Sequence, residues 1–380
     1  MLRTLVLSSV LSISLVASNA RSDTERQANL NLQTYVGLEN ERAERDYCGK
    51  KADLVKPVLP TRLAVSNYFE CAIDSSKTSL CWYWSGAPSR GSQHGPEALK
   101  GHAHSLSVTS HTEYNSRAEE GSRFSLRFAA CGASDEGAVY CWNPNKVENS
   151  LEIFSEPKPT KLVQVSVAET GLHISRCSLS DSAVLKCDGD QSSPLLDVHH
   201  VLVASGRSYS LSKSGKIKVG YYSPGDEKEL GNDGDYFLLM GVGGLRAVGL
   251  TPNELVLDKQ PYTCCDLTRF KVANAFDVVQ IAVNDYGAYL LTRFGRVDMY
   301  ADYKYENSDG GGDHHEAFQT QESLKRWVKS LRNIVQIATS DYGLWAVNAQ
   351  GEVLVFHKQD HAPAGLRVYV QDLLTHFEFN

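Results

Sequence analysis

The sequence predicts an all-β protein, a seven-bladed β-propeller, and three observations lead to this fold class. Three pairs of cysteines have the same ten-residue spacing. Each pair encloses a polar turn between two apolar runs, which is the pattern of a β-hairpin. The same strand–turn–strand pattern then recurs without cysteines through the second half of the chain, so the chain consists of repeats.

The cysteine pairs are best explained as disulfides across the hairpins. Directly opposed residues on antiparallel strands have Cα atoms roughly 4.5–5.5 Å apart, and a disulfide accepts about 4.4–6.8 Å. Zinc binding is the alternative, but zinc sites prefer cysteines separated by only about two to four residues. The predicted disulfides are Cys71–Cys81, Cys131–Cys141 and Cys177–Cys187.

The remaining three of the nine cysteines are Cys48, Cys264 and Cys265. Adjacent cysteines rarely bond to each other, so we expect Cys48 to pair with one of the other two. The last thiol is then free, buried or shared with another chain.

The N-terminus has the pattern of a secretory signal peptide. Arg3 precedes a serine-diluted apolar segment from Leu5 to Val16, and Ser18-Asn19-Ala20 is a small-x-small cleavage site. The apolar segment is too short to cross a bilayer, and no membrane span is expected elsewhere. We therefore expect residues 1–20 to be removed and the mature chain to be secreted or periplasmic, where disulfides persist.

The later repeats retain the hairpin turn. VVQIAVNDYGAYLLTRFGRV begins at Val278 and IVQIATSDYGLWAVNAQGEV begins at Ile334, so VQIA, DYG and the turn glycine recur at an offset of 56. Weaker copies complete seven units, and their mean spacing of about 46 residues suits one four-stranded blade per unit. The seven equivalent turn positions are Lys77, Gly137, Ala183, Gly215, Asn253, Gly295 and Gly351.

The segments FAACGASDEGAVYCW and VVQIAVNDYGAYLLTRFGRV resemble repeats of the regulator of chromosome condensation family, V-x-I-A-x-G-x-x-H-x-x-A-L-x-x-x-G-x-V-Y-x-W-G. The resemblance covers about Leu63 to Lys358, and the paired cysteines look like those of its secreted bacterial version. The repeat histidine is replaced in several copies, for example by Ser208 and Leu344. Members of this family include a nucleotide exchange factor, modules of ubiquitin ligases, a photoreceptor and inhibitors of β-lactamase. The resemblance therefore implies a propeller without specifying its function.

Charge and motifs exclude several functions. The net charge is −7, and no basic face of the kind that binds nucleic acid is visible. No nucleophile elbow, H-E-x-x-H or P-loop is present, so we predict no catalytic residue, no cofactor and no metal. Acidic pairs such as Asp233 and Asp235 lie in glycine-bearing turns, where polar turn chemistry is the common role. Calcium binding or a glycosidase carboxylate pair is the alternative.

The expected domain organisation is a signal peptide, an N-terminal arm over residues 21–60 and a propeller over residues 61–380. Inserted loops are expected at about residues 86–120, which contain several histidines, and 303–332. The second loop includes a possible metal-binding stretch, Asp309 to Glu316, whose alternative is a solvated loop. An inserted helix should follow, because Leu324, Trp327, Val328 and Leu331 have helical spacing. This helix either caps the blades or presents its basic face as a docking surface.

Aromatic residues gather just after the second hairpin strand, toward what would be one rim of the propeller. Tyrosine and tryptophan anchor protein interfaces, although alternate strand residues must also pack between blades. We predict an extracytoplasmic module that binds a partner protein, of unknown identity, through one rim and its inserted loops. The alternatives are a propeller enzyme acting on a glycan or peptide at the central channel, and a structural component of the cell envelope or surface. The candidate interface residues are Tyr83, Trp84, Tyr221, Tyr222, Tyr303 and Tyr305.

Overall fold

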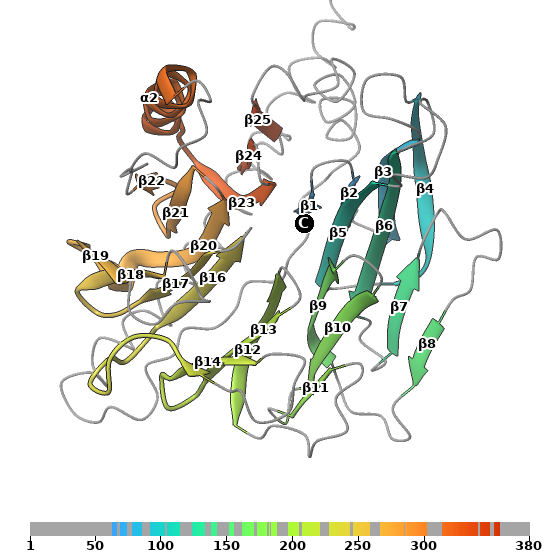
Figure 1. Ribbon diagram of the computed structural model, residues 1–380, viewed down its shortest axis with the longest axis horizontal. Coiled ribbons are helices and arrows are strands. Elements are labelled where there is room, and N and C mark those ends of the chain that lie inside the picture. The colour runs from blue at the N-terminus through green and yellow to red at the C-terminus, as the bar shows by residue number, and fades with distance from the viewer. Residues whose placement is uncertain are drawn as a thin grey trace, which may run out of the picture.

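Antiparallel β-sheets make up most of the residues that the structure, a computed structural model, describes (Figure 1). The N-terminal arm, Cys48, Cys264, Cys265 and the stretch from residue 302 to 313 lie outside the described residues. The structure describes residues 63–66, 69–73, 78–85, 92–102, 105–114, 124–133, 138–142, 152–155, 162–170, 173–180, 182, 184–187, 197–204, 207–220, 228–243, 246–258, 267–284, 286–301, 314–340, 343–349 and 353–357.

The described strands form seven sheets, each made of consecutive strands, which we number in chain order. Sheets 1, 2, 4 and 5 have four strands, and sheets 3, 6 and 7 have three. Sheet 1 contains β1 (Leu63–Val65), β2 (Phe69–Ile73), β3 (Thr78–Ser85) and β4 (Ser92–His102). Sheet 2 contains β5 (Ser105–Tyr114), β6 (Phe124–Ala133), β7 (Ala138–Trp142) and β8 (Glu152–Ser155). Sheet 3 contains β9 (Leu162–Thr170), β10 (His173–Ser180) and β11 (Leu185–Cys187).

The other four sheets follow the same order along the chain. Sheet 4 contains β12 (Val198–Ala204), β13 (Arg207–Ser212), β14 (Ile217–Gly220) and β15 (Lys228–Glu229), and sheet 5 contains β16 (Leu239–Gly243), β17 (Arg246–Leu250), β18 (Glu254–Asp258) and β19 (Leu267–Lys271). Sheet 6 contains β20 (Val278–Asn284), β21 (Gly287–Thr292) and β22 (Val297–Tyr300). Sheet 7 contains β23 (Ile334–Ser340), β24 (Gly343–Asn348) and β25 (Val353–His357).

The sheets are arranged in a ring. The first strand of each sheet contacts the first strand of the next, in the order β1, β5, β9, β12, β16, β20 and β23, and β23 contacts β1. A separate cluster of buried apolar residues lies between each pair of neighbouring sheets, including sheets 7 and 1. Antiparallel sheets packed face to face around a ring are the architecture of a β-propeller, so the prediction of an all-β propeller is confirmed.

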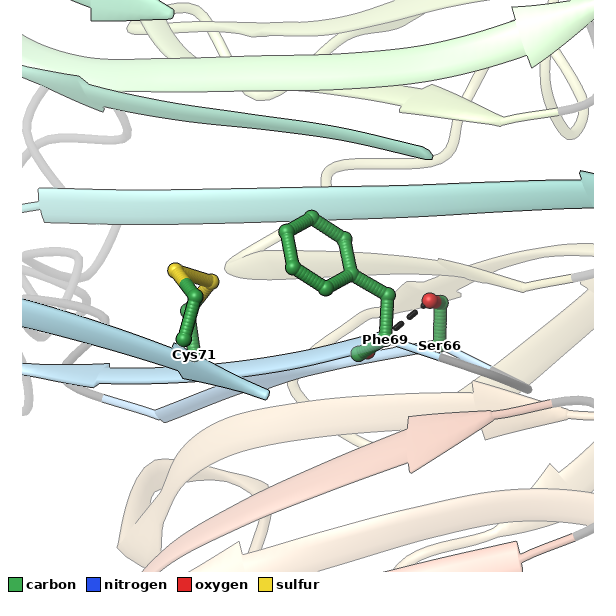
Figure 2. Close-up of a disulfide and its surroundings, with 4 residues drawn as sticks. Ser66, Phe69 and Cys71 are labelled. Carbon is green, nitrogen blue, oxygen red and sulfur yellow. Dashed lines mark hydrogen bonds between the residues drawn. A yellow bond between two sulfur atoms is a disulfide. The ribbon is translucent and has the colours of Figure 1, made fainter. Parts of the chain in front are cut away.

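Three disulfides join the second and third strands of sheets 1 to 3. Cys71 opposes Cys81 directly, and the other two pairs have the same register. Their Cα atoms are 4.0–4.1 Å apart, close to the roughly 4.5 Å of a non-hydrogen-bonded pair. Figure 2 shows the Cys71 disulfide and the Phe69 ring on the same face of sheet 1, and both belong to the apolar cluster with Leu106 of sheet 2. The disulfides therefore also form part of the core between sheets.

An apolar pair fills the equivalent position in sheets 4 to 7. Tyr209 opposes Val219 in sheet 4, again ten residues along the chain, and both lie in the cluster between sheets 4 and 5. Disulfides and apolar side chains thus occupy one repeated site, because each must fill the same space against the next sheet. The equivalent pairs in sheets 5 to 7 are Val248–Leu257, Tyr289–Met299 and Trp345–Val355.

Amide side chains that are buried or half-buried link the first strands of neighbouring sheets, which explains the glutamine of the VQIA motif. The Gln280 Nε2 donates to the Ile337 carbonyl at 2.9 Å, and the Ile337 N–H donates to Gln280 Oε1 at 3.0 Å. In the same way, the Val201 N–H donates to Gln164 Oε1 at 3.0 Å. Each glutamine satisfies backbone groups of the next sheet that would otherwise be buried without partners.

The inserted helix is α2 (His314–Ser330), and its apolar spacing predicted it correctly. Leu324 and Val328 are buried with Leu331 in the cluster between sheets 6 and 7. The Trp327 ring packs against Phe356, with ring centroids 5.6 Å apart. α2 therefore covers apolar surface of the two sheets. Within the described residues, no helix has the length and apolar content needed to cross a membrane.

The segment around residues 86–120 differs from the inserted loop that the sequence predicts. It contains two strands, the edge strand β4 and the first strand of sheet 2, β5. β4 includes Gly95 and Pro96, residues that rarely mark a strand. An edge strand tolerates both, because one of its sides makes no ladder hydrogen bonds.

Candidate protein-interaction surface

The turns between the second and third strands share one construction. At the end of the second strand of sheets 3 to 6, a serine or threonine hydroxyl accepts a hydrogen bond from the backbone N–H of a residue at, or directly before, the start of the third strand. Such local side-chain bonds stabilise tight turns. The bonds run from the N–H groups of Val184, Lys216, Glu254 and Arg296 to Ser180, Ser212, Thr251 and Thr292, with lengths of 3.2, 3.1, 3.0 and 3.2 Å.

Glycines at two of these turns are required by backbone conformation and by space. Gly215 and Gly295 have φ values of 75° and 71°, which favour glycine. A Cβ on Gly295 would lie 2.8 Å from the Asn333 Cα, and one on Gly215 would lie 2.5 Å from the Tyr236 ring. Both turns therefore press against the segment that leads into the next sheet.

Hydrogen bonds fix the turns to those segments. The Phe237, Val272 and Ile334 N–H groups donate to the carbonyls of three turn residues, at 2.8, 2.9 and 3.0 Å. The accepting residues are Gly215, Asn253 and Gly295, which confirms these three predicted turn positions. The other four predicted positions, Lys77, Gly137, Ala183 and Gly351, lie outside the described residues.

Phe294 is exposed at the turn of sheet 6. It is the one large apolar side chain that is exposed, at 57%, in the part of the chain that the structure describes. The turn reads Arg293-Phe294-Gly295-Arg296, whereas the equivalent turn of sheet 4 reads Lys213-Ser214-Gly215-Lys216. Because serine serves in an equivalent turn, the fold does not require an aromatic ring there.

Arg293 holds the Phe294 ring from one side. Its guanidinium carbon lies 4.9 Å from the ring centroid, a cation–π contact of about 0.5–1 kcal/mol at an exposed site. Arg293 is itself fixed, because its Nε lies 2.9 Å from the Asp277 Oδ1 and its backbone N–H donates to the Asp277 carbonyl at 2.7 Å. The aromatic side chain is therefore oriented before any partner binds.

A cavity of about 460 Å³ opens beside Phe294. It lies between sheet 6 and the segment that leads into it, which includes the short 3₁₀ helix η2 (Ala275–Asp277). The volume falls in the lower part of the roughly 300–1,000 Å³ that is usual for binding pockets. The lining residues are Val272, Ala273, Asn274, Asp277, Val278, Thr292, Phe294, Arg296, Asp298 and Tyr300.

Tyr300 contributes a neutral hydroxyl to this cavity. Burial raises the pKa of its phenol, and the negative charge of Asp298 raises the pKa further. The ring is held by an edge-to-face contact with Phe270, at a centroid distance of 5.8 Å. Tyr300 therefore remains protonated at neutral pH beside an exposed carboxylate, so the cavity has both apolar and polar walls.

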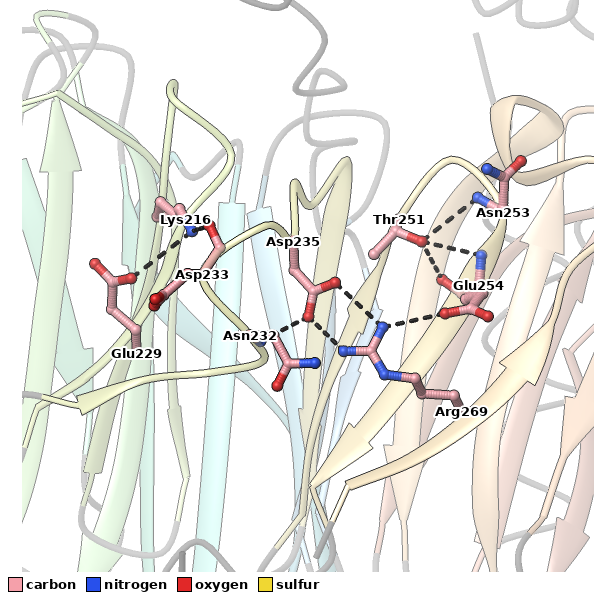
Figure 3. A network of polar contacts seen from close by, with 9 residues as sticks. All are labelled: Lys216, Glu229, Asn232, Asp233, Asp235, Thr251, Asn253, Glu254 and Arg269. Carbon is pink, nitrogen blue, oxygen red and sulfur yellow. Dashed lines mark hydrogen bonds and ion pairs between the residues drawn. The ribbon is translucent and has the colours of Figure 1, made fainter. Parts of the chain in front are cut away.

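An ion-pair network fixes the neighbouring turn of sheet 5 (Figure 3). The Arg269 guanidinium contacts Asp235 at 2.6 Å and Glu254 at 3.1 Å. Partial burial works to raise the pKa of Asp235, but hydrogen bonds from Arg269 and the Asn232 N–H, with nearby positive charge, outweigh it and lower the pKa. Asp235 thus stabilises a turn, which is the structural role that the sequence favoured over calcium binding or catalysis. The backbone carbonyl of Asp233 accepts a hydrogen bond from Lys216 at 2.8 Å.

The prediction that six aromatic residues form the interface stays a prediction, because their side chains lie outside the description. Tyr83 and Trp84 belong to β3, where Tyr83 opposes Phe69, but their side chains lie outside the description. Tyr221, Tyr222, Tyr303 and Tyr305 lie outside the described residues entirely. Sequence reasoning missed Phe294, although aligning its turn with the turn of sheet 4 would have shown an aromatic residue in place of Ser214.

Comparisons with known proteins place the chain in no family. No family model and no curated protein matches the sequence. Solved structures similar to this one include human WBSCR16, with 13% identity and a TM-score of 0.44 over 75% of this chain and 89% of that one.

Two further similar structures come from a plant and a yeast. The CRINKLY WD40 ectodomain of the Arabidopsis thaliana receptor kinase ACR4 has 13% identity and a TM-score of 0.41, over 78% of this chain and 98% of that one. Hsv2 of Kluyvelomyces marxianus has 8% identity and a TM-score of 0.48, over 79% and 92%. At such identities the propeller assignment rests on the ring of sheets itself.

Proposed function

We propose that the chain is a seven-bladed extracytoplasmic propeller, of the regulator of chromosome condensation type, that binds a partner protein and has no catalytic activity of its own. Each of the seven sheets would be one blade. The partner would dock on the face formed by the turns between second and third strands.

Phe294 is the observation that carries this proposal. A large ring that the turn does not need is exposed, oriented by Arg293 and placed beside a cavity. Aromatic residues and arginine are enriched in protein interfaces and dominate their binding energy. A rigid ring that presents such side chains on turns can bind a partner without any chemistry.

The extracytoplasmic location is supported by the disulfides and by the signal-peptide pattern. Cys71, Cys131 and Cys177 are each buried in a core between sheets. A protein that depends on disulfides for its core suits an oxidising compartment. Tyr83, Trp84 and the four predicted tyrosines remain candidate contacts with the same partner.

The test is affinity capture with the mature, oxidised chain from Arg21 onward, followed by crosslinking and mass spectrometry of its source's envelope and secreted fractions. We expect one partner near one-to-one stoichiometry, crosslinked to the turn face. The Phe294→Ser variant should recover it at least about tenfold less efficiently, because a hot-spot residue contributes about 2 kcal/mol or more.

The matched control is Ser214→Ala, which alters the equivalent position in sheet 4 and should leave recovery unchanged. Equal recovery by the wild type and Phe294→Ser would contradict docking at this turn. Failure of the wild type, with three intact disulfides, to capture any partner would contradict the binding function. Glycans and peptides would then be screened for turnover.

A further inference from the structure

We infer that the partner presents an acidic segment to a basic surface around Phe294, with one apolar side chain entering the adjacent cavity. This inference rests on the proposed function and specifies the chemistry of the partner. The surface, which we call the basic turn surface, consists of Phe294, Arg296, Lys329 and Arg332.

Backbone contacts place the parts of this surface together. The Ile334 N–H donates to the Gly295 carbonyl at 3.0 Å, and Gly295 packs directly against Asn333. The turn of sheet 6 therefore lies beside the C-terminal end of α2, where Lys329 lies in the last helical turn and Arg332 follows the helix. On its other side, the same turn borders the cavity through Phe294 and Arg296.

The positive groups of this surface are available to a ligand. Arg296 and Lys329 are exposed, and among the described residues neither side chain has an ion-pair partner. Arg332 uses its Nη1 to donate to the carbonyls of Lys329 and Leu331, both at 2.6 Å, which holds its guanidinium at the helix end. Within the described part of the chain, its Nε and Nη2 donors make no hydrogen bond and remain to bind a carboxylate.

Among the described residues, the neighbouring acidic groups do not neutralise the surface. Asp277 is already paired with Arg293, and Glu322 lies near Lys325, one turn earlier on α2. Asp298 is exposed at the cavity wall and would itself repel an acidic group placed deep in the cavity. The acidic residues of a partner should therefore contact Arg296, Lys329 and Arg332, and an apolar side chain should enter the cavity.

Charge complementarity favours an acidic protein segment over other anionic ligands. The chain carries a net charge of −7, so most of its surface repels an acidic partner. A local basic surface would attract the acidic segment and so fix the orientation in which the partner binds. A membrane surface requires a broad apolar face, whereas the described residues expose one large apolar ring here. Val272, Val278 and Tyr300 line part of the cavity with apolar surface, which an apolar side chain of a protein segment can contact.

The turn of sheet 4 is an internal comparison. It has the same basic pattern, but Lys216 donates to the Asp233 carbonyl at 2.8 Å and lies 3.9 Å from Glu229. It also carries Ser214 where sheet 6 carries Phe294. Lys213→Glu therefore changes a similar charge on a turn without the aromatic ring, and it serves as the control variant.

The experiment measures fluorescence anisotropy of labelled synthetic peptides with the full mature, oxidised chain at low salt. The probes are a short glutamate-rich peptide with one central leucine, the same peptide with serine for leucine, and its lysine-rich counterpart. We expect the first to bind most tightly. Arg296→Glu and Phe294→Ser should each weaken it at least about tenfold, which corresponds to 1.4 kcal/mol.

Circular dichroism checks that the variants are folded. We expect Arg296→Glu to fold, because sheet 5 already carries Glu254 at the position equivalent to Arg296. Lys213→Glu should retain wild-type affinity, and added salt should weaken binding by screening. Unchanged binding by Arg296→Glu and Phe294→Ser, or preference for the lysine-rich peptide, would overturn the inference. So would binding of phosphatidylglycerol vesicles without binding of the acidic peptide.

These outcomes are distinct from failure of the proposed function. If capture finds a partner crosslinked elsewhere on the ring and the acidic peptide does not bind, the protein-binding function stands and this inference is wrong. If the acidic peptide binds at Phe294 but capture finds no partner, the basic turn surface is real and the proposed function is wrong.

Discussion

The carboxyl group of Glu70 lies against the indole of Trp345, at the interface where sheet 1 meets sheet 7. Both side chains are buried. Burial raises the pKa of Glu70 to about 8, and hydrogen bonding from the Trp345 indole works against this shift. The closure of the ring therefore includes an acid that is protonated at neutral pH.

We predict that Glu70→Gln removes a pH dependence of stability. Between the ordinary pKa of 4.5 and about 8, the folded wild type holds a proton that the unfolded chain has lost. Its contribution is thus fully present below pH 4.5 and lost as pH rises through 8, a change of up to about 5 kcal/mol. Denaturant unfolding of both proteins across this range should show the wild type losing stability relative to Glu70→Gln. Parallel curves would show that Glu70 titrates normally.

His200 should produce the opposite slope. Burial, together with the positive charge of His199, lowers its pKa from 6.5 to about 3. The folded state therefore excludes a proton that the unfolded state binds below pH 6.5. Its contribution is present above 6.5 and lost as pH falls toward 3. His200→Gln should flatten the acid limb of the stability curve, measured by thermal unfolding, while leaving the alkaline limb unchanged. A steeper acid limb in the variant would contradict this.

The disulfide of sheet 3 should be partly replaceable by the apolar pair of sheet 5. Removing a disulfide across a short loop costs about 2–4 kcal/mol. The double variant Cys177→Ser with Cys187→Ser should lose the stability that the disulfide contributes. It should also lose the apolar packing that the two cysteines provide in the core between sheets 3 and 4. Cys177→Val with Cys187→Leu, which imitates Val248–Leu257, should be more stable than the serine variant by about 1–2 kcal/mol. Denaturant titration compares them, and equal stabilities would show that the site is not packed as described.

Gly295→Ala should be destabilising by about 1–3 kcal/mol, because it combines a positive φ with a contact to the backbone of Asn333. The matched control is Gly234→Ala, since a Cβ on Gly234 would have no neighbour within 4 Å. Thermal unfolding should show a clear loss for the first variant and little change for the second. Similar values for both would mean that the sheet 6 turn does not press on the next segment.

The sequence by itself determined the features that depend on neighbouring residues. The ten-residue spacing predicts the three disulfides, because hairpin register is local. The recurring turns predict the β-propeller, and the spacing of Leu324, Val328 and Leu331 predicts α2. The polar edge strand β4 was missed, because an edge strand needs no apolar pattern.

Only the tertiary structure decided which surfaces meet and which side chains remain outside. The contact of Glu70 with Trp345 joins opposite ends of the chain, and the cavity combines a turn of sheet 6 with the segment before it. The exposure of Phe294 likewise depends on how Gly295 and Asn333 pack. Hydrophobic burial is non-directional, so an apolar residue in a repeat indicates a core without saying which neighbour completes it. The packing of the sheets in the ring determines which neighbour covers each apolar residue, and it leaves Phe294 exposed at the surface.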